Sequence, residues 1–525
     1  MRDATIKHEW KRDMELYTDN GSAAVSPQGN APKVLAQKPV RKKKWWPWIA
    51  GGAVLVAAAA IALVLCLTPA ASDAAEYPAS PVLFVDGGEV YLAAGGEAIL
   101  LDGASIIKNY YEEDVVNAEM TDDGRWLYYM ANVDGTTDDG DLMRIALWDV
   151  AAEPELVAEG VNAAKISEDG SRVLYITNCE RLEGDIYLCT PGGESERLDK
   201  GVYLYDFGLS PDGTYAYYAL ADGVFTEELV LWTDGKSEKV ADLEDEMLLW
   251  VQCDNDGRLA YGLYNDGDSE AYLFDGEDTE RVRDVRIVLA AFSGADEFLY
   301  LNNDSELCYC VKGETEQIAG DDAWPRFPNY TGAQYGLDTR FLFSDDDTLY
   351  EIRIPGEADE VCEADGVFSL DPDFRYVAYE QEGTLYLTRK TAAGWQDEGQ
   401  VCDNPFKLWF TKEALYYIAM EHENDEAGTL WRMTLSSGEQ EELLSNAGSV
   451  VHVRGEQYVL TEDGAVYHIT AAGEPECIAE GATALYGAQN GVYVSDEEGL
   501  LYCGRDGATE RVPRGGTVID IYGAL

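Results

Sequence analysis

The chain has 525 residues, more than one ordinary hydrophobic core organises, so several domains or an array of repeats are expected. With 33 Tyr, 51 Gly and few helix-like apolar stripes, the composition favours an all-β protein. The net charge of −61 is unevenly spread: residues 1–44 carry +5, residues 45–72 carry none, and the remainder carries −66. The acidic remainder should repel nucleic acid and anionic membrane surfaces, which excludes both as its partners.

Residues 1–44 are polar, with Gly, Ser, Pro and Gln concentrated between residues 21 and 39. Such a segment buries too little apolar area to fold, so a disordered tail is predicted. The tail ends in the basic cluster Arg41–Lys44.

Residues 45–67 contain no charged side chain and begin with three Trp, at positions 45, 46 and 48. A helix of that length spans about 34 Å, enough to cross a bilayer, and indoles favour the membrane interface. The preceding basic cluster predicts that the tail is cytoplasmic and that everything after the helix is extracytoplasmic. Residues 68–80, rich in Ala and Pro, read as a linker.

Two other interpretations of this segment are less favoured. A cleaved signal peptide has a shorter apolar core, and a polar segment as long as residues 1–44 rarely precedes it. A lipoprotein signal needs a small residue before the modified cysteine, but Leu65 precedes Cys66.

A turn phrase recurs after the linker, most clearly in Leu209–Tyr218, where Ser-Pro-Asp-Gly precedes an aromatic run. The Asp-Gly pair predicts a tight turn, and the aromatic run predicts a half-buried strand. The turn glycines Gly124, Gly170, Gly213 and Gly257 are 46, 43 and 44 residues apart. That period is typical of a β-propeller.

Each repeat has four parts, which correspond to the four strands of one propeller blade. In one copy they are an apolar strand (161–166), a post-turn strand (172–176), a Gly-x-Leu-Tyr-like strand (184–187) and a charged outer strand (194–198). The second part is found eleven times, with a marker residue at Phe84, Tyr129, Tyr175, Tyr218, Tyr261, Tyr300, Phe343, Tyr379, Tyr417, Val459 and Val494.

Residues 81–84 resemble the second strand of a repeat, but no first strand precedes them. Residues 517–522 resemble the first strand of a repeat, but no further blade follows them. We expect the C-terminal strand to complete blade 1, which removes exposed sheet edges. Eleven blades exceed the usual range of about four to eight, so two tandem rings are favoured over one large ring. The expected break is 321–331, which contains two prolines and no strand pattern, separating blades 1–6 (81–320) from blades 7–11 (332–525).

The Ser210-Pro211-Asp212-Gly213 phrase resembles the TolB-type propeller repeat, which is related in shape to WD repeats. Partial matches occur at Asp122–Gly124, Asp169–Gly170 and Asp256–Gly257, and Asp371-Pro372-Asp373 lacks the Gly. The repeat occurs in binding scaffolds, in periplasmic assembly proteins and as the lid domain of some peptidases. The resemblance implies a protein-interaction or ligand-binding role outside the membrane.

The sequence contains none of the common catalytic motifs. There is no Gly-x-Ser-x-Gly, His-Glu-x-x-His, phosphate loop or dinucleotide fingerprint, and no Cys-x-x-Cys. His452 and His468 fall in strands of one repeat and could be neighbours, but we expect a structural role. Cys179 and Cys189 could face each other across a hairpin, which leaves a disulfide open, and Cys308 and Cys310 should point the same way along one strand.

Acidic loops are the remaining candidates for chemistry. Residues 132–141 and 265–268 offer oxygen ligands at a density seen in calcium sites, although neither fits the twelve-residue calcium loop. Solvated hairpin loops are the favoured interpretation, so calcium is only a weak possibility. Glycoside hydrolysis needs a pair of neighbouring carboxylates. With 94 acidic residues after the apolar segment some pair will always lie close together, so such a pair does not indicate this activity.

We therefore expect a non-catalytic binding or scaffolding module of the cell envelope, anchored in the bilayer through 45–67, with no catalytic, cofactor-binding or metal residues. A protein or glycan would bind one face of the propeller. The alternatives are an envelope sensor that signals through the cytoplasmic tail, or an enzyme acting on wall or extracellular polymer.

Overall fold

The computed structural model describes residues 82–522 apart from short gaps, of which the longest is 327–339. These residues belong to one compact unit, 75–525, in which every named element is a β-strand. The expected tail, membrane helix and linker lie outside the described residues. In the part that is described, there is no helix with the length and apolarity needed to cross a bilayer.

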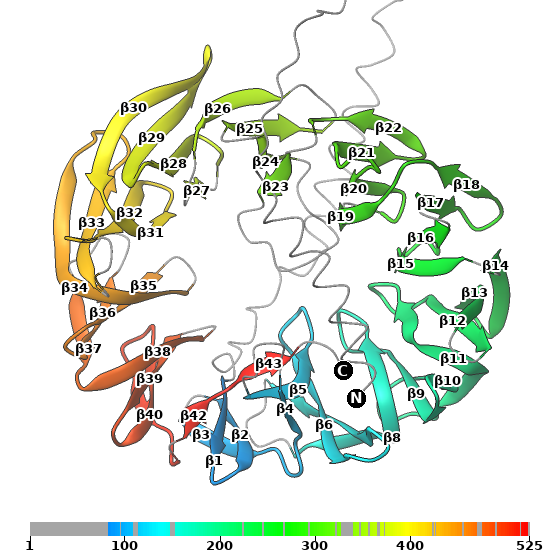
Figure 1. The fold of residues 1–525 in the computed structure, drawn as a ribbon. Helices are drawn as coiled ribbons and strands as arrows, with labels where there is room; N and C mark the ends of the chain where they lie inside the picture. Colours follow the sequence, from blue (N-terminus) through cyan, green and yellow to red (C-terminus); the bar gives the residue numbers. More distant parts are fainter. Residues whose placement is uncertain are drawn as a thin grey trace, which may run out of the picture. The chain divides into compact units, whose positions relative to one another are not determined.

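The strands form eleven antiparallel four-stranded blades, which follow one another around a ring in chain order (Figure 1). From the inner to the outer strand, the first six blades are β42 (Thr517–Val518), β1 (Val82–Asp86), β2 (Glu89–Ala94), β3 (Glu97–Leu100); β5 (Asp114–Met120), β6 (Trp126–Asp134), β7 (Asp139–Ala146), β8 (Glu155–Ile166); β8, β9 (Val173–Glu180), β10 (Glu183–Cys189), β11 (Glu196–Leu209); β11, β12 (Ala216–Asp222), β13 (Phe225–Thr233), β14 (Lys236–Asp242); β15 (Met247–Cys253), β16 (Leu259–Asn265), β17 (Asp268–Phe274), β18 (Thr279–Val282); and β19 (Ile287–Ala291), β20 (Glu297–Leu301), β21 (Leu307–Val311), β22 (Glu314–Gln317).

The other five blades are β23 (Trp324–Arg326), β24 (Arg340–Asp345), β25 (Thr348–Arg353), β26 (Asp359–Glu363); β27 (Phe368–Leu370), β28 (Tyr376–Gln381), β29 (Thr384–Thr391), β30 (Gly394–Asp403); β31 (Pro405–Phe410), β32 (Ala414–Ala419), β33 (Gly428–Thr434), β34 (Gln440–Val453); β34, β35 (Glu456–Thr461), β36 (Val466–Ile469), β37 (Glu476–Ala479); and β38 (Ala482–Ala488), β39 (Gly491–Asp496), β40 (Gly499–Gly504), β41 (Thr509–Arg511). Two further strands, β4 (Ile106–Lys108) and β43 (Asp520–Tyr522), pair with β5.

Three strands serve two blades each: β8, β11 and β34 begin as the outer strand of one blade and end as the inner strand of the next. Each contains one residue with positive φ near its middle, Gly160 (63°), Gly201 (68°) or Asn446 (56°). These are residue types that adopt this conformation most readily. A single residue therefore redirects the chain from the outside of the ring to its inner side.

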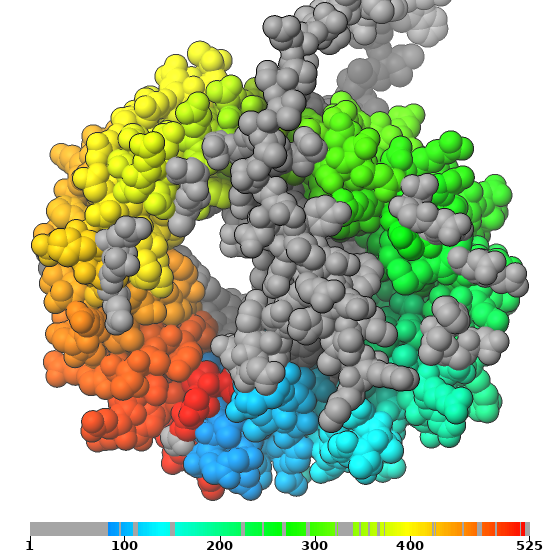
Figure 2. Space-filling model, in the orientation of Figure 1, coloured from blue at the N-terminus to red at the C-terminus, as the bar shows by residue number. Residues whose placement is uncertain are grey.

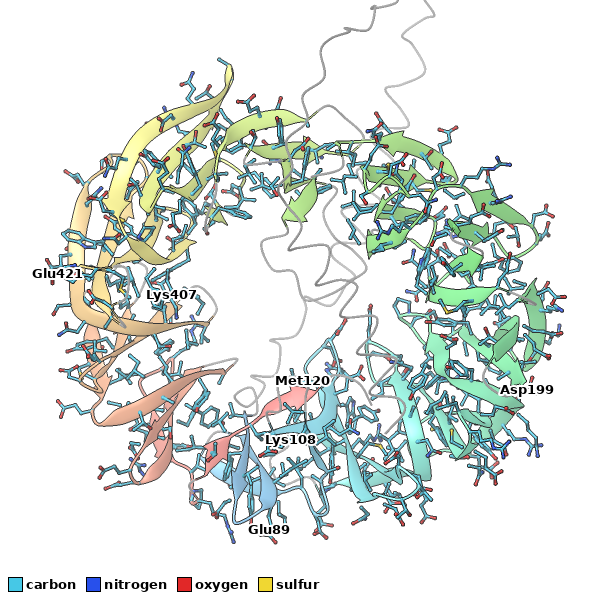
Figure 3. The ribbon with its side chains drawn as sticks, in the orientation of Figure 1. Glu89, Lys108, Met120, Asp199, Lys407 and Glu421 are labelled. Atoms are coloured by element: carbon cyan, nitrogen blue, oxygen red, sulfur yellow. The ribbon has the colours of Figure 1, made fainter. Side chains whose placement is uncertain are left out.

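All eleven marker residues predicted from the sequence lie on the second strand of their blades, and all are buried. The charged fourth strands lie at the outside of the ring, as expected: β22 and β41 are exposed along their whole length. In Figure 3, Asp199 lies at the outer edge of the ring, whereas Met120 and Lys407 lie on its inner side.

Buried side chains join each blade to the next. Leu299 of blade 6 packs in one cluster with Phe343 of blade 7, and Tyr493 of blade 11 packs in one cluster with Phe84 of blade 1. Each of the other nine junctions has a cluster of its own. Two tandem rings would instead require blade 6 to pack on blade 1, so the expectation of two rings is wrong and the blades form one ring (Figure 2).

The part of the expected break 321–331 that the structure describes, residues 323–326, belongs to blade 7 and does not separate two rings. Trp324–Arg326 form β23, the inner strand of blade 7, and Pro325 lies opposite Phe343 of β24. Among the described strands β23 pairs only with β24, so a proline, which lacks an N–H group, can occupy this edge position without breaking the sheet. Pro325 therefore marks an edge strand, and the second proline of the segment lies outside the described residues.

The C-terminus closes the ring in two steps. In β42, Thr517 and Val518 pair with Val85 and Phe84 of β1, and the Ile519 N–H group donates a hydrogen bond to the Leu83 carbonyl (2.9 Å). The chain then continues into β43, which runs parallel to β5 of blade 2. The segment predicted as one strand, 517–522, is thus divided between two blades. β42 covers the edge of β1 in blade 1, and β43 covers the edge of β5 in blade 2.

A disulfide between β1 and β42 tests this closure. We expect Val85→Cys with Thr517→Cys to form an intrachain disulfide under mild oxidation, because Cα atoms of directly opposed strand residues lie within disulfide range. The bond should raise the free energy of unfolding in urea by about 2–4 kcal/mol, and dithiothreitol should remove the gain. Each single variant serves as a control, and thiols that stay free under oxidation would contradict the register.

Candidate functional site

The Ser-Pro-Asp-Gly turn is confirmed as a tight turn, and its polar groups serve the fold. The Ser210 hydroxyl donates to the Asp212 carboxylate (2.9 Å) and accepts the Tyr215 N–H (3.0 Å), while Gly213 has a φ of 69°. The Asp212 N–H donates to the Asn255 side-chain oxygen of the next blade (2.9 Å). The Ser210 and Asp212 side chains thus stabilise their own turn, and the Asp212 N–H connects it to the next blade.

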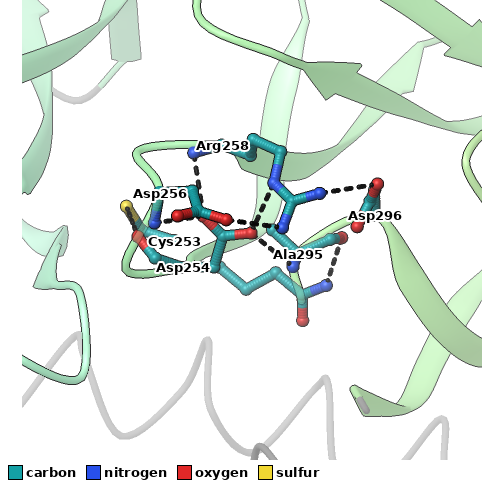
Figure 4. Close-up of polar contacts among 7 residues, drawn as sticks. Cys253, Asp254, Asp256, Arg258, Ala295 and Asp296 are labelled. Atoms are coloured by element: carbon teal, nitrogen blue, oxygen red, sulfur yellow. Dashed lines mark hydrogen bonds and ion pairs between the residues drawn. The ribbon is translucent and has the colours of Figure 1, made fainter. Parts of the chain in front are cut away.

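The less regular copies of the phrase replace the hydroxyl with a buried carboxylate and add an arginine four residues later. Asp254, 5% exposed, accepts N–H groups of Asp256, Arg258 and Ala295 (2.9, 3.0 and 3.2 Å). The Arg258 guanidinium contacts Asp254 (2.8 Å) and reaches Asp296 on blade 6 (3.0 Å), as Figure 4 shows. This ion-pair cluster therefore connects blades 5 and 6.

The same replacement occurs in blade 8. The buried Asp371 pairs with Arg375 (2.9 Å), whose guanidinium donates to the Lys412 carbonyl on blade 9 (2.8 Å). The Asp-x-Asp-x-Arg pattern of residues 254–258 and 371–375, which matches the repeat phrase only in part, is thus a second way of connecting neighbouring turns.

The acidic loop 132–141 stabilises itself. Asp134 accepts both the N–H (2.8 Å) and the hydroxyl (2.6 Å) of Thr136, which lower the pKa of its carboxyl group. Asn132 donates to Asp141 (2.9 Å), and Thr137 donates to Asp139 (2.9 Å). Among the described residues no group of His, Cys, Asp and Glu side chains has metal-binding geometry, and the loop 265–268 is only partly described.

The two strand histidines have separate environments. His452 contacts the Trp409 ring of blade 9 (4.8 Å between centroids), and its burial lowers its pKa. His468 stacks on Tyr458 (4.7 Å) and contacts Glu456 (3.1 Å), which also pairs with Arg505 of blade 11. The imidazole of His452 thus faces blade 9, whereas that of His468 lies on the side of blade 11, so the two histidines do not form a joint site.

All described cysteines are free, including Cys179 and Cys189. Cys189 lies opposite Val173 in the β9–β10 hairpin, whereas Cys179 lies near the other end of it, so the two cannot pair. Cys308 and Cys310 do share one buried cluster, as their spacing predicts.

Four exposed apolar side chains, which we call the apolar rim, lie on three consecutive blades. Met247 and Ile287 are the first residues of inner strands β15 and β19, and Tyr264 lies opposite Met247. The fourth residue, Tyr205, lies in β11. Their exposed fractions run from 37% to 50%. Met247, Ile287 and Tyr264 lie at the blade ends away from the Ser-Pro-Asp-Gly-like turns, because those turns follow the opposite ends of the inner strands. Tyr205 lies between Val202 and Phe207 of β11, nearer the middle of its blade.

A cavity of about 270 Å³ lies between blades 7 and 8, lined by Arg340, Glu351, Arg353, Asp359 and Lys390. None of the sequence motifs predicts this cavity, although a signal for it is present in the third strands of the repeat. In β29 the third-strand phrase reads Thr384-Leu-Tyr-Leu387, whereas in β25 it reads Thr348-Leu-Tyr-Glu351. A carboxylate thus replaces a leucine at a buried position of the repeat.

Removing the buried carboxylate of Asp254 tests the connection between blades 5 and 6. Asp254→Ala leaves three N–H donors and a guanidinium without their acceptor, so we expect a loss of about 2–4 kcal/mol in the free energy of unfolding. The control is Asp256→Ala, whose side chain is 79% exposed and also contacts Arg258 (3.2 Å). It should cost less than about 1 kcal/mol. Equal losses in urea unfolding would contradict the assignment.

No protein-family model matches this chain, and no curated protein matches it. Solved structures resemble it in fold at about one identical residue in ten. A eukaryotic initiation factor is 10% identical with a TM-score of 0.38, covering 76% of this chain and 95% of that one. TolB from Acinetobacter baumannii is 11% identical with a TM-score of 0.26, covering 45% and 62%. The β-propeller domain of the Trilobed protease from Pyrococcus furiosus is 10% identical with a TM-score of 0.31, covering 65% and 97%. These likenesses concern the β-propeller fold alone.

Proposed function

We propose that the protein is a single-pass membrane protein whose β-propeller lies outside the cytoplasm and acts as a non-catalytic binding or scaffolding module of the cell envelope. The anchor is the charge-free segment 45–67, and the basic cluster before it favours a cytoplasmic N-terminus. The strong negative charge of the remainder favours a soluble domain that does not adhere to anionic lipid.

The observation that carries the binding role is the apolar rim. Exposed aromatic and aliphatic side chains held on rigid strands cost little conformational entropy on binding, and Tyr is enriched at interface centres. Here Tyr205, Met247 and Tyr264 protrude from neighbouring blades of an otherwise acidic ring. The partner that fits is a protein with an apolar contact surface and basic surroundings.

Labelling of Cys477 tests on which side of the membrane the propeller lies. Cys477 is the exposed one among the described cysteines. Burial raises the pKa of Cys179 to about 11 and that of Cys402 to about 12, so these remain protonated thiols that react slowly. In intact cells we expect a membrane-impermeant maleimide to label the chain, and Cys477→Ser to lose most of the label. Labelling that requires permeabilised cells would place the ring on the cytoplasmic side and contradict the proposal.

Crosslinking tests the apolar rim as the binding surface. In intact cells that make the full chain, Met247→Ser with Tyr264→Ser should lower the yield of the main partner crosslink at least about tenfold, because apolar anchors at an interface contribute more than about 1 kcal/mol each. Leu156→Ser is the matched control, since Leu156 is 50% exposed on an outer strand. Unfolding in urea confirms that each variant is folded, and an undiminished crosslink in the double variant would refute the role of the rim.

A further inference from the structure

The cavity between blades 7 and 8 has an unusual charge balance for this chain. Its lining residues supply three cations, Arg340, Arg353 and Lys390, against the two carboxylates of Glu351 and Asp359. The site therefore carries a net positive charge within a chain of net charge −61.

Glu351 organises the cavity wall. It is 3% exposed, and its carboxylate contacts the Arg340 guanidinium, the Lys390 ammonium and the Trp395 indole N–H (3.0 Å). A buried carboxylate with three donors has little capacity left for a ligand. Its role is to fix Arg340 and Lys390 at the cavity.

Arg340 is held on its other side as well. Its guanidinium lies over the Phe374 ring (4.1 Å to the centroid) and donates to the Phe374 carbonyl (3.3 Å). Stacking and hydrogen bonds restrict a side chain that is otherwise flexible, so the entropy cost of binding a ligand is reduced.

Arg353 provides the free charge. It lies directly opposite Arg340 in the β24–β25 pair and is exposed, and no described residue forms an ion pair with it. Like charges in directly opposed positions destabilise a sheet. An anion that contacts both guanidinium groups would relieve that repulsion and accept charge-assisted hydrogen bonds from both.

The size and charge of the cavity define the ligand. A volume of about 270 Å³ is close to the lower limit of small-molecule sites, which begin at about 300 Å³. The surplus of one positive charge matches a monoanion, whereas Glu351 and Asp359 disfavour a dianion such as phosphate. We propose that this cavity binds the carboxylate of one small unit, either a sugar acid or the C-terminal residue of a peptide. The site is remote in sequence from the apolar rim and is independent of the function proposed above.

Calorimetric titration of the full chain in detergent micelles tests the proposal, with glucuronate, N-acetylalanine, inorganic phosphate and glucose as probes. We expect at least one carboxylate to bind, and the one that binds better identifies the source. Arg353→Ala should weaken that binding at least tenfold without lowering the free energy of unfolding in urea, because Arg353 is exposed and its removal also relieves the repulsion of Arg340. Arg283→Ala, which removes an exposed arginine after β18 of blade 5, should have no effect.

Three results would overturn the proposal. The first is no binding of either carboxylate. The second is phosphate or glucose binding as tightly as the better carboxylate. The third is an equal loss of affinity in Arg353→Ala and Arg283→Ala, which would indicate general attraction of anions to the surface.

Discussion

The packing of each blade against the next is the interaction on which this structure depends. A single four-stranded sheet exposes two apolar faces, and only a neighbour on each side can cover both. Tyr129, Tyr218 and Tyr417 are almost completely buried in this way, and each such side chain contributes about 1.5–3 kcal/mol. A linear row of blades would leave one apolar face exposed on the first blade and one on the last. Burial of every face therefore requires both the clusters at all eleven junctions and the pairing of β42 with β1, which closes the ring.

Polar contacts between neighbouring turns supplement this packing at one end of the blades. In blades 3 and 4 a hydroxyl and an Asp-Gly pair form the turn, whereas blades 5 and 8 use the buried Asp254 and Asp371 with an arginine. The opposite ends of the inner strands lack these turns, and Met247, Tyr264 and Ile287 of the apolar rim lie there. The fold thus separates a cross-connected end from an end that presents exposed side chains on rigid strands.

The sequence predicted the blade plan well because it repeats locally: the markers from Phe84 to Val494 all fall on second strands. It failed where long-range closure decides the outcome. No local pattern distinguishes one ring of eleven blades from two smaller rings, and Pro325 reads as a break until its strand is known to be an edge. The cavity was missed because Glu351 is a single departure from a repeat, and its meaning depends on Lys390, which lies on the next blade.

A crystal structure of residues 75–525 tests the central claim most directly. The account predicts eleven blades around one axis, with Thr517 and Val518 beside β1 and with blade 6 packed on blade 7. Two axes, or blade 6 packed against blade 1, would contradict it.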